Sequence, residues 1–207
     1  MNGKLIVIEG LDGTGKSTQA ALLHERLNNT GRASVLSAEP TGGEIGKLIR
    51  RAISGKEAFS PAALAALFLA DRIDHNTNPE NGLQTVLAEG VCVISARYYY
   101  SSMAYQGKDT DFDWVMRQNL DCPYIRTPDL CVFLDMDPEK CMERICSTRD
   151  CAALDVFENL ADLTQIREAF HRVLERLKST QNIVVIDADA PIEEISDKIF
   201  KEALALF

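Results

Sequence analysis

The chain has 207 residues, of which 46% are hydrophobic, so it is long and apolar enough to fold around a full core as a single domain over residues 1–207. The formal net charge of -9 argues against a nucleic-acid-binding protein, which usually carries a basic face. It does not exclude a nucleotide site, because a local positive region can lie inside an acidic protein.

The first predicted element is a buried strand over Leu5–Ile8, an apolar and β-branched run. It leads into residues 10–17, Gly-Leu-Asp-Gly-Thr-Gly-Lys-Ser, which match the phosphate-binding pattern G-x-x-x-x-G-K-[ST]. Residues 18–27 then have helical spacing, with Leu23 and Leu27 on one face. A chance match in a Gly-rich turn is the alternative, but strand, loop and helix together favour a phosphate site.

The residue types of this loop suit a polyphosphate. Glycines let successive backbone N–H groups point into one cavity, and the helix that begins near Lys16 adds the positive end of its dipole. Lys16 would meet the β- and γ-phosphates, and the hydroxyl of Ser17 is suited to ligate Mg²⁺.

Four more strand-like runs follow at 33–36, 91–94, 130–134 and 183–186, with helical patterns between them. This alternation predicts an α/β fold, a five-stranded parallel sheet covered by helices on both faces. The predicted helices span residues 45–53, 62–74, 78 to just before 90, 111–120, a segment that begins at Asp137-Pro138, 164–178 and 192–206.

Two polar segments lie where a ligand would bind. Residues 95–107 follow the third predicted strand, and ligands of open parallel sheets bind outside the carboxyl ends of the strands. Residues 144–158 lie between two predicted helices and form a candidate mobile lid that contains Arg144 and Arg149.

The six cysteines show no zinc-ligand spacing, and we expect them to be reduced, as in a cytosolic protein. The N-terminus has no basic and apolar signal segment, and no apolar run approaches the length of a membrane span. We therefore expect a cytoplasmic protein with neither a membrane nor a nucleic-acid partner.

Six segments support a family assignment when they are taken together in chain order. They are Gly10–Thr18, Glu39-Pro40 with Gly42 and Gly43, Phe68–Arg72, Arg97-Tyr98 with residues 101–107, Leu134–Pro138 and Asp155–Glu158. This set resembles the nucleoside monophosphate kinases and, most closely, the thymidylate kinase family, over essentially the whole chain. The resemblance implies a P-loop kinase fold with a small lid, phosphoryl transfer from ATP to dTMP that gives ADP and dTDP, a need for Mg²⁺, and a homodimer.

The resemblance also implies roles for individual residues. The implied catalytic residues are Lys16, Arg97 and Arg149, with Arg144 near the adenine. Gly13 stands where some members carry an Arg, a pattern of members whose lid delivers the catalytic Arg. The implied ATP contacts are Gly10, Leu11, Asp12, Gly13, Thr14, Gly15, Lys16, Ser17, Thr18 and Arg144, with Ser17 on the metal. The implied dTMP contacts are Asp12, Glu39, Phe68, Arg72, Arg97, Ser101, Tyr105 and Gln106.

Each acceptor residue has a physical rationale and an alternative. Phe68 and Arg72 share a helix face, so Phe68 would stack on a pyrimidine and Arg72 would donate to its carbonyl edge, although spacing alone favours a core Phe beside a solvated Arg. Arg97 suits bidentate phosphate binding or a surface ion pair. Gln106 suits a thymine edge or closes a loop. Tyr105 would exclude a 2′-hydroxyl, or simply packs.

Two residues depart from the family pattern. Ala96 stands where the family usually has an Asp that helps to hold Mg²⁺ through water, and Ala38 stands where bacterial members often have an Arg. Because Ala96 can carry no charge, three hypotheses stay open. The chain is an active thymidylate kinase that relies on another carboxylate such as Asp135, a non-catalytic or weakly active nucleotide-binding relative, or a kinase of another nucleoside monophosphate or a deoxynucleoside.

Overall fold

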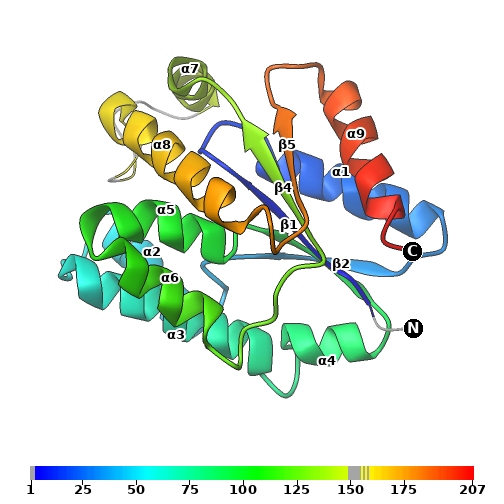
Figure 1. Cartoon of the computed structure of the whole chain (residues 1–207), viewed down its shortest axis with the longest axis horizontal. Coiled ribbons are helices and arrows are strands. Elements are labelled where there is room, and N and C mark those ends of the chain that lie inside the picture. The colour runs from blue at the N-terminus through cyan, green and yellow to red at the C-terminus, as the bar shows by residue number, and fades with distance from the viewer. Residues whose placement is uncertain (1–2, 149–154, 156, 158) are drawn as a thin grey trace.

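The computed structural model describes residues 3–148, 155, 157 and 159–207, and its centre is a five-stranded parallel sheet (Figure 1). The strand order is β2-β3-β1-β4-β5, and all four pairings are parallel. The strands are β1 (Leu5–Gly10), β2 (Ser34–Ala38), β3 (Cys92–Ala96), β4 (Leu130–Asp135) and β5 (Ile183–Asp187). The predicted α/β class with five parallel strands is confirmed.

Helices cover both faces of this sheet. Helices α1 and α9 lie on one face, and α5 and α8 lie on the other (Figure 1). The helices are α1 (Lys16–Asn29), α2 (Glu44–Ile53), α3 (Pro61–Thr77), α4 (Leu83–Ala88), α5 (Tyr99–Asp109), α6 (Phe112–Leu120), α7 (Pro138–Thr148), α8 (Leu160–Leu177) and α9 (Ile192–Leu204).

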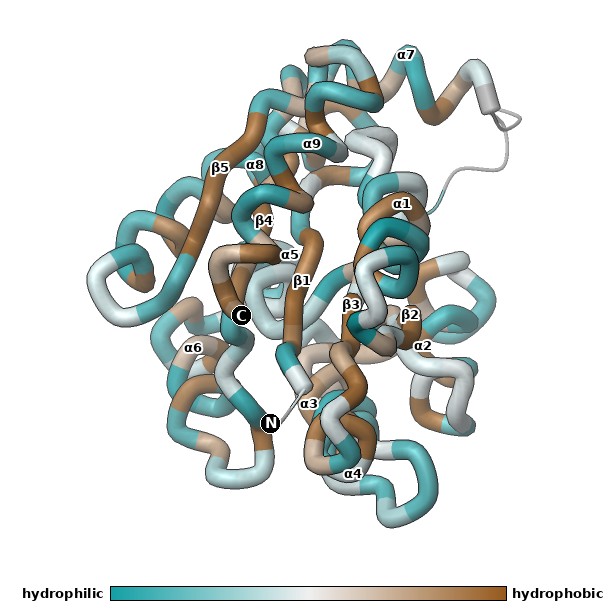
Figure 2. Tube along the Cα trace, turned by 90° about the vertical axis from the view of Figure 1, so that its right-hand side faces the viewer, coloured by the Kyte–Doolittle hydropathy of each residue, from teal (hydrophilic) through white to brown (hydrophobic). Residues whose placement is uncertain are grey.

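The core lies where the central strands meet these helices. Every residue of β1 is buried, as a strand covered on both faces requires. Figure 2 shows the same contrast, with apolar colours along β1, β4 and β5 and polar colours on the outer turns. Because these strands pair in parallel, the carboxyl ends of β1, β2 and β3 meet at one edge.

One helix was not predicted. Helix α5 occupies residues 99–109, inside the segment expected only to follow the third strand. Its first residues are Tyr, Tyr, Ser and Ser, which are weak helix formers. The helix is instead fixed by a distant partner, because the backbone N–H groups of Tyr98 and Ser101 donate to the Glu9 carboxylate of β1.

Two helix starts also differ from prediction. Helix α4 begins at Leu83 rather than at Asn78, because the Asn78 side chain accepts from the backbone of Glu80 and Asn81 and makes a turn there. Helix α8 begins at Leu160, where Asn159 caps it, four residues before the predicted start. Helix α7 reaches Thr148, so residues 144–148 of the predicted lid are helical. The rest of that lid lies outside the described residues, apart from residues 155 and 157.

The cysteine expectation needs a correction. Cys92, Cys122, Cys131 and Cys141 are free, but Cys146 is disulfide-bonded. The expectation of reduced cysteines is therefore wrong at that position. No helix in the described part of the chain has the length and apolarity needed to cross a membrane.

Candidate active site

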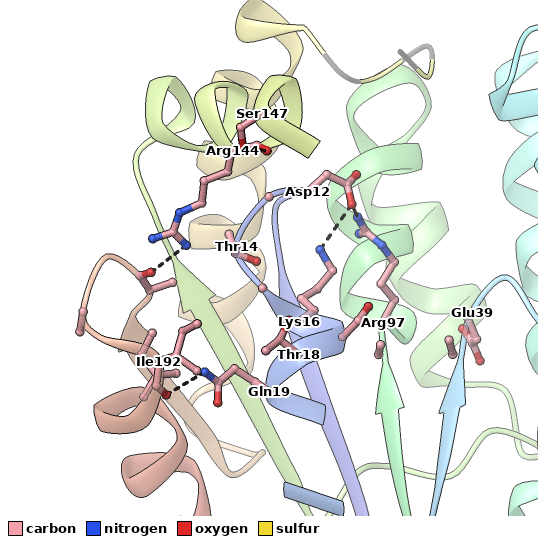
Figure 3. A pocket seen from close by; sticks show the side chains of 18 of the residues that line it. Asp12, Thr14, Lys16, Thr18, Gln19, Glu39, Arg97, Arg144, Ser147 and Ile192 are labelled. Carbon is pink, nitrogen blue, oxygen red and sulfur yellow. Dashed lines mark hydrogen bonds and ion pairs between the residues drawn. The ribbon is translucent and has the colours of Figure 1, made fainter. Parts of the chain in front are cut away.

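A large cleft opens at the carboxyl ends of β1, β2 and β3, as the position of the loop motif predicts (Figure 3). Its volume is about 920 Å³, within the range of nucleotide and cofactor sites. Residues from five parts of the chain line it: 12–19 of the phosphate loop and α1, 38–40 with Arg50, 96 and 97 at the end of β3, 144 and 147 of α7, and 188, 190, 192 and 195 before and within α9.

The phosphate loop places α1 with its N-terminus toward this cleft. Gly15 precedes the helix with a φ of 90°, a conformation that favours glycine. The Thr14 hydroxyl donates to the carbonyl of Leu11 at 2.8 Å and closes the turn of the loop. Ser17 and Thr18 are exposed on the first turn of α1 and line the cleft. Gly10 and Leu11 shape the loop but do not line the cleft.

Gly13 brings the loop into close contact with α7. A Cβ atom built at Gly13 would lie 2.6 Å from the backbone oxygen of Cys141, and the φ of Gly13 is 87°. A side chain is therefore excluded by two independent factors, steric contact and backbone conformation. An Arg cannot occupy this position without a shift of α7.

Lys16 lies at the floor of the cleft with 8% of its surface exposed. Its Nζ donates to the Leu11 carbonyl at 2.7 Å and lies 3.5 Å from the Asp12 carboxylate (Figure 3). Burial and the nearby charge of Arg97 lower the pKa of Lys16 to about 8, against the opposing effect of Asp12. The ammonium group is thus held close to the loop, and an anion bound beside it would stabilise its charged form.

Arg97 lies between the cleft and a second cavity. Its Nη2 donates to Asp12 at 2.7 Å and to the Tyr105 hydroxyl at 3.2 Å, and its Nη1 donates to Ser101 at 2.9 Å. Burial raises the pKa of Asp12, but the charges of Arg97 and Lys16 outweigh burial and hold that pKa well below its usual range. A cation, an anion and a second cation therefore alternate at this junction.

The second cavity is smaller, about 140 Å³, and lies between α3 and α5. Phe68, Ser101, Tyr105 and Gln106 line it, as predicted for an acceptor site, together with Asp12 and Arg97. Pro40, Ile53, Asp155 and Phe157 complete its wall. The Phe157 ring packs edge-on against Tyr105, with centroids 5.6 Å apart. The pocket is narrow and aromatic, which suits a flat ring.

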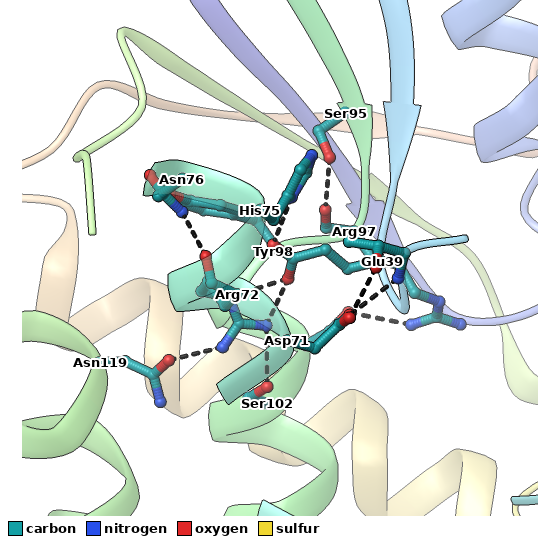
Figure 4. Close-up of polar contacts among 12 residues, drawn as sticks. Glu39, Asp71, Arg72, His75, Asn76, Ser95, Arg97, Tyr98, Ser102 and Asn119 are labelled. Atoms are coloured by element: carbon teal, nitrogen blue, oxygen red, sulfur yellow. Dashed lines mark hydrogen bonds and ion pairs between the residues drawn. The ribbon is translucent and has the colours of Figure 1, made fainter. Parts of the chain in front are cut away.

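Arg72 does not line either cavity, and Figure 4 shows it enclosed by polar side chains. It is 1% exposed, and its Nε donates to Glu39 at 2.8 Å, its Nη1 to Asn119 at 2.5 Å and its Nη2 to Ser102 at 3.0 Å. The solvated Arg that spacing alone favoured is therefore wrong. Its predicted donation to a base carbonyl stays a prediction, and it would require a rearrangement of these bonds.

Glu39 lines the large cleft but its two oxygens are already engaged. Oε2 accepts from Arg72, and Oε1 lies 2.9 Å from Nδ1 of His75. His75 in turn lies 2.6 Å from the Ser37 hydroxyl. Glu39 thus joins β2 to α3, and its predicted contact with substrate stays a prediction.

The lid residues divide between described and undescribed parts. Arg144 of α7 lines the cleft and donates to the Ala188 carbonyl at 3.3 Å, beside the apolar residues Ala190 and Ile192. This location fits the predicted neighbourhood of a base. Arg149, predicted to be catalytic, lies outside the described residues.

Asp135 is not available as a substitute acid. Arg167 donates to both of its oxygens, at 2.7 and 3.0 Å, and His171 lies 3.5 Å away. Asp135 lines a different cavity, whereas Ala96 lines the large cleft. The suggestion that Asp135 replaces the carboxylate missing at position 96 is therefore not supported.

Several cleft residues were missed from the sequence. Arg50 of α2 lines the cleft and donates to the carbonyls of Pro40 and Thr41. Ala188, Ala190 and Ile192 were also missed, although they follow β5, and the rule that ligands bind at strand carboxyl ends would have indicated them. The described residues contain no group of three or more His, Cys, Asp or Glu poised to hold a metal.

A phosphate loop that opens into a cleft, joined through an Arg–Asp pair to a second pocket on a parallel sheet, defines a P-loop nucleotide kinase. The family model described as thymidylate kinase matches residues 8–199. The chain therefore belongs to the thymidylate kinase family.

Similar proteins agree with this assignment. The chain is 36% identical over 205 residues to a probable thymidylate kinase of Pyrococcus horikoshii, covering 96% of this chain and 95% of the relative. It is 37% identical over 204 residues to one of Thermococcus onnurineus, covering 94% of each. The solved thymidylate kinase of Candida albicans, described as having broad substrate specificity, superposes with a TM-score of 0.81 at 25% identity, over 99% of this chain and 92% of that one.

Proposed function

We propose that this member of the thymidylate kinase family transfers the γ-phosphoryl group of ATP to dTMP, with ATP in the large cleft and the nucleoside of dTMP in the small cavity. The observation that carries this division is the shared wall, because Asp12 and Arg97 line both spaces. Two phosphates brought to that wall would lie near Lys16 and Arg97. Phosphoryl transfer depends mainly on such alignment and on neutralisation of negative charge.

On the donor side, the loop supplies backbone N–H groups and Lys16 supplies a mobile cation. Lys16 would exchange its bond to the Leu11 carbonyl for the β- and γ-phosphates, a short movement within the same floor. Arg144 would lie against the adenine beside Ile192, and Arg149 would supply charge from the lid.

Mg²⁺ would be held by Ser17 and the phosphates. Ser17 is an exposed hydroxyl on the wall of the cleft, a hard oxygen ligand of the kind that Mg²⁺ takes. Mg²⁺ in such sites is usually bound by one or two protein oxygens together with substrate phosphates, which fits a cleft without a preformed acidic cage among the described residues. When bound, the ion neutralises phosphate charge.

On the acceptor side, Phe68 would stack on the thymine and Gln106 would meet its polar edge. Tyr105 is held by Phe157 and by the Arg97 guanidinium, so it would limit the room beside the sugar. The Arg97 guanidinium would receive the monophosphate, with the Ser101 hydroxyl supporting its Nη1. The comparisons give no support to a non-catalytic relative.

We also propose that the chain acts as a cytoplasmic homodimer. Closed two-fold dimers are the commonest soluble assembly, and the resemblance implies one here. A concentration-independent monomer mass by light scattering would contradict the dimer.

A coupled ADP-release assay across dTMP, dUMP, dCMP, dGMP and AMP tests the proposed function. We expect dTMP to be preferred over the purine monophosphates by well over tenfold, because a purine would leave polar groups of the pocket unpaired. Comparable kcat/KM values for AMP or dGMP would contradict the acceptor assignment. No ADP release with any acceptor would contradict the kinase itself.

A further inference from the structure

Glu9 is a fully buried carboxylate that lines neither cavity. It lies at the end of β1, one residue before the phosphate loop motif. Its Oε1 accepts from the backbone N–H of Tyr98 at 2.8 Å and of Ser101 at 3.2 Å, and its Oε2 accepts from the Ser101 hydroxyl at 2.6 Å. Burial raises the pKa of Glu9, and the Ser101 hydroxyl, the charge of Arg97 and the two backbone N–H groups oppose that rise by favouring the charged form.

The bond from Ser101 to Glu9 determines which way that hydroxyl points. A serine hydroxyl has one proton, and a carboxylate can only accept, so the proton of Ser101 is directed at Glu9. The lone pairs of the Ser101 oxygen then remain for the Nη1 of Arg97, which donates to it at 2.9 Å. Glu9 therefore acts on Arg97 through one intermediate hydroxyl.

The backbone around Arg97 is held by hydrogen bonds to β1 and to Ser95 of β3. The Arg97 N–H donates to the Ile8 carbonyl at 3.0 Å, and the Arg97 carbonyl accepts from the Ser95 hydroxyl at 2.9 Å (Figure 4). Arg97 has a φ of 70°, which non-glycine residues seldom adopt. The bond from Tyr98 to Glu9 fixes the next peptide, so the Arg97 turn is restrained on both sides.

We propose that Glu9 is a positioning residue for Arg97: it fixes the turn at residues 97–98 and polarises the Ser101 hydroxyl, so that the guanidinium faces the junction of the cleft and the cavity. This inference rests on the proposed function, in which Arg97 receives the phosphate of dTMP. Asp12 and Tyr105 hold Nη2 of Arg97 directly, and Glu9 acts on Nη1 through Ser101.

A simple helix-capping role for Glu9 makes a different prediction. Capping of α5 needs only an acceptor at Oε1, which the amide oxygen of a glutamine also provides. A glutamine would, however, place its NH₂ group where Oε2 now accepts from Ser101, and it would direct a donor at that hydroxyl. Glu9→Gln therefore retains the cap and removes the polarisation.

The test is a double-mutant cycle between Glu9→Gln and Arg97→Ala in the full chain, with the dTMP Kd measured by calorimetry and kcat and KM measured for both substrates. We expect Glu9→Gln to weaken dTMP binding about tenfold in the Arg97 background, within the range for directly coupled residues. We expect a change of less than about twofold when Arg97 is alanine, and a similarly small change in the KM for ATP.

Asp129→Asn is the matched control. Asp129 accepts from the backbone N–H of Leu5 at 2.9 Å, so it holds the start of β1 much as Glu9 holds its end, away from both cavities. We expect Asp129→Asn to lower the Tm without a change in the dTMP Kd. A Glu9→Gln variant that behaves in the same way, with a lower Tm and an unchanged Kd, would show that Glu9 is structural only.

Ser101 variants keep the inference testable if Glu9→Gln does not fold. We expect Ser101→Ala to weaken dTMP binding about tenfold and Ser101→Thr, which retains the hydroxyl, to restore it. Equal losses for Glu9→Gln in both backgrounds, or full affinity in Ser101→Ala, would overturn the assignment of Glu9. Failure of the wild-type chain to bind dTMP would instead overturn the proposed function.

Discussion

The donor cleft and the acceptor pocket are built in different ways. The cleft is formed around one continuous stretch, residues 12–19, and much of its binding capacity comes from backbone N–H groups at the start of α1. The pocket is assembled from α3, α5 and the segment before α8, and the same two helices carry a buried ionic network centred on Arg72. The donor cleft therefore depends mainly on backbone conformation, whereas the acceptor pocket depends on side-chain pairs between distant segments.

The largest expected effect comes from removal of Arg72, the buried cation of the α3 network. Arg72→Ala leaves the buried Glu39 carboxylate without its Arg, with only His75 beside it, and such a loss costs about 3–5 kcal/mol of unfolding free energy. Urea unfolding measures it. Arg51→Ala is the control, because its pair with Glu57 is exposed and is worth at most about 1 kcal/mol. If Arg72→Ala lost less unfolding free energy than Arg51→Ala, the acceptor pocket would not depend on the buried pair of Arg72 and Glu39.

A catalytic loss without a stability loss is expected in the donor cleft. Lys16→Ala removes a cation that contacts only the loop carbonyl of Leu11 and Asp12, so kcat should fall about 10²–10³-fold while the Tm stays nearly constant. Lys140→Ala, which removes an exposed Lys paired with Asp189, should leave kcat unchanged. Near-normal turnover in Lys16→Ala would contradict the phosphate-loop assignment.

The carboxylate absent at position 96 offers a gain rather than a loss. Ala96 lines the cleft beside Arg97, so Ala96→Asp should lower the Mg²⁺ concentration needed for half-maximal activity, by about tenfold at the low end of effects from residues around metal ligands. A magnesium titration of both proteins measures it. High turnover in the wild type with no gain in the variant would show that the cleft already has what it needs.

The smallest effect isolates backbone shape in the donor cleft. Gly13→Ala and Gly31→Ala both place a side chain at a positive φ, 87° and 79°, but only the first meets another backbone, at Cys141. We expect Gly13→Ala to lose about 1 kcal/mol more unfolding free energy than Gly31→Ala, since overpacking adds to the shared strain. Its KM for ATP should also rise, whereas that of Gly31→Ala should not. Equal losses would show that α7 moves freely.

The donor cleft could be predicted from the sequence more directly than the acceptor pocket, because the cleft is built on one continuous stretch and the pocket is not. The loop 10–17 lies in one continuous motif, and the five strands follow from local apolar runs, although β2 and β5 are partly exposed. Phe68, Ser101, Tyr105 and Gln106 were placed in one pocket through family resemblance, since nothing in their spacing connects α3 to α5.

What the sequence did not reveal depends on long-range contacts. Helix α5 begins where it does because Glu9, 90 residues earlier than Tyr99, accepts from its first turn, and local propensity contains no such information. The engagement of Arg72 likewise requires Asn119 and Ser102, which come from two other helices. Residues of this kind are found only when the sheet order is known.

Arg97 is the only non-glycine residue with a positive φ in the part of the chain that the structure describes. Such a conformation costs on the order of 1–3 kcal/mol and is maintained only where surrounding contacts impose it. Stability and activity therefore make opposite demands at this position. A laboratory selection for heat resistance alone would favour Gly or Asn at position 97. A selection in which growth also depends on the kinase activity would retain Arg. Position 97 would thus reveal which of the two pressures an evolving population has experienced.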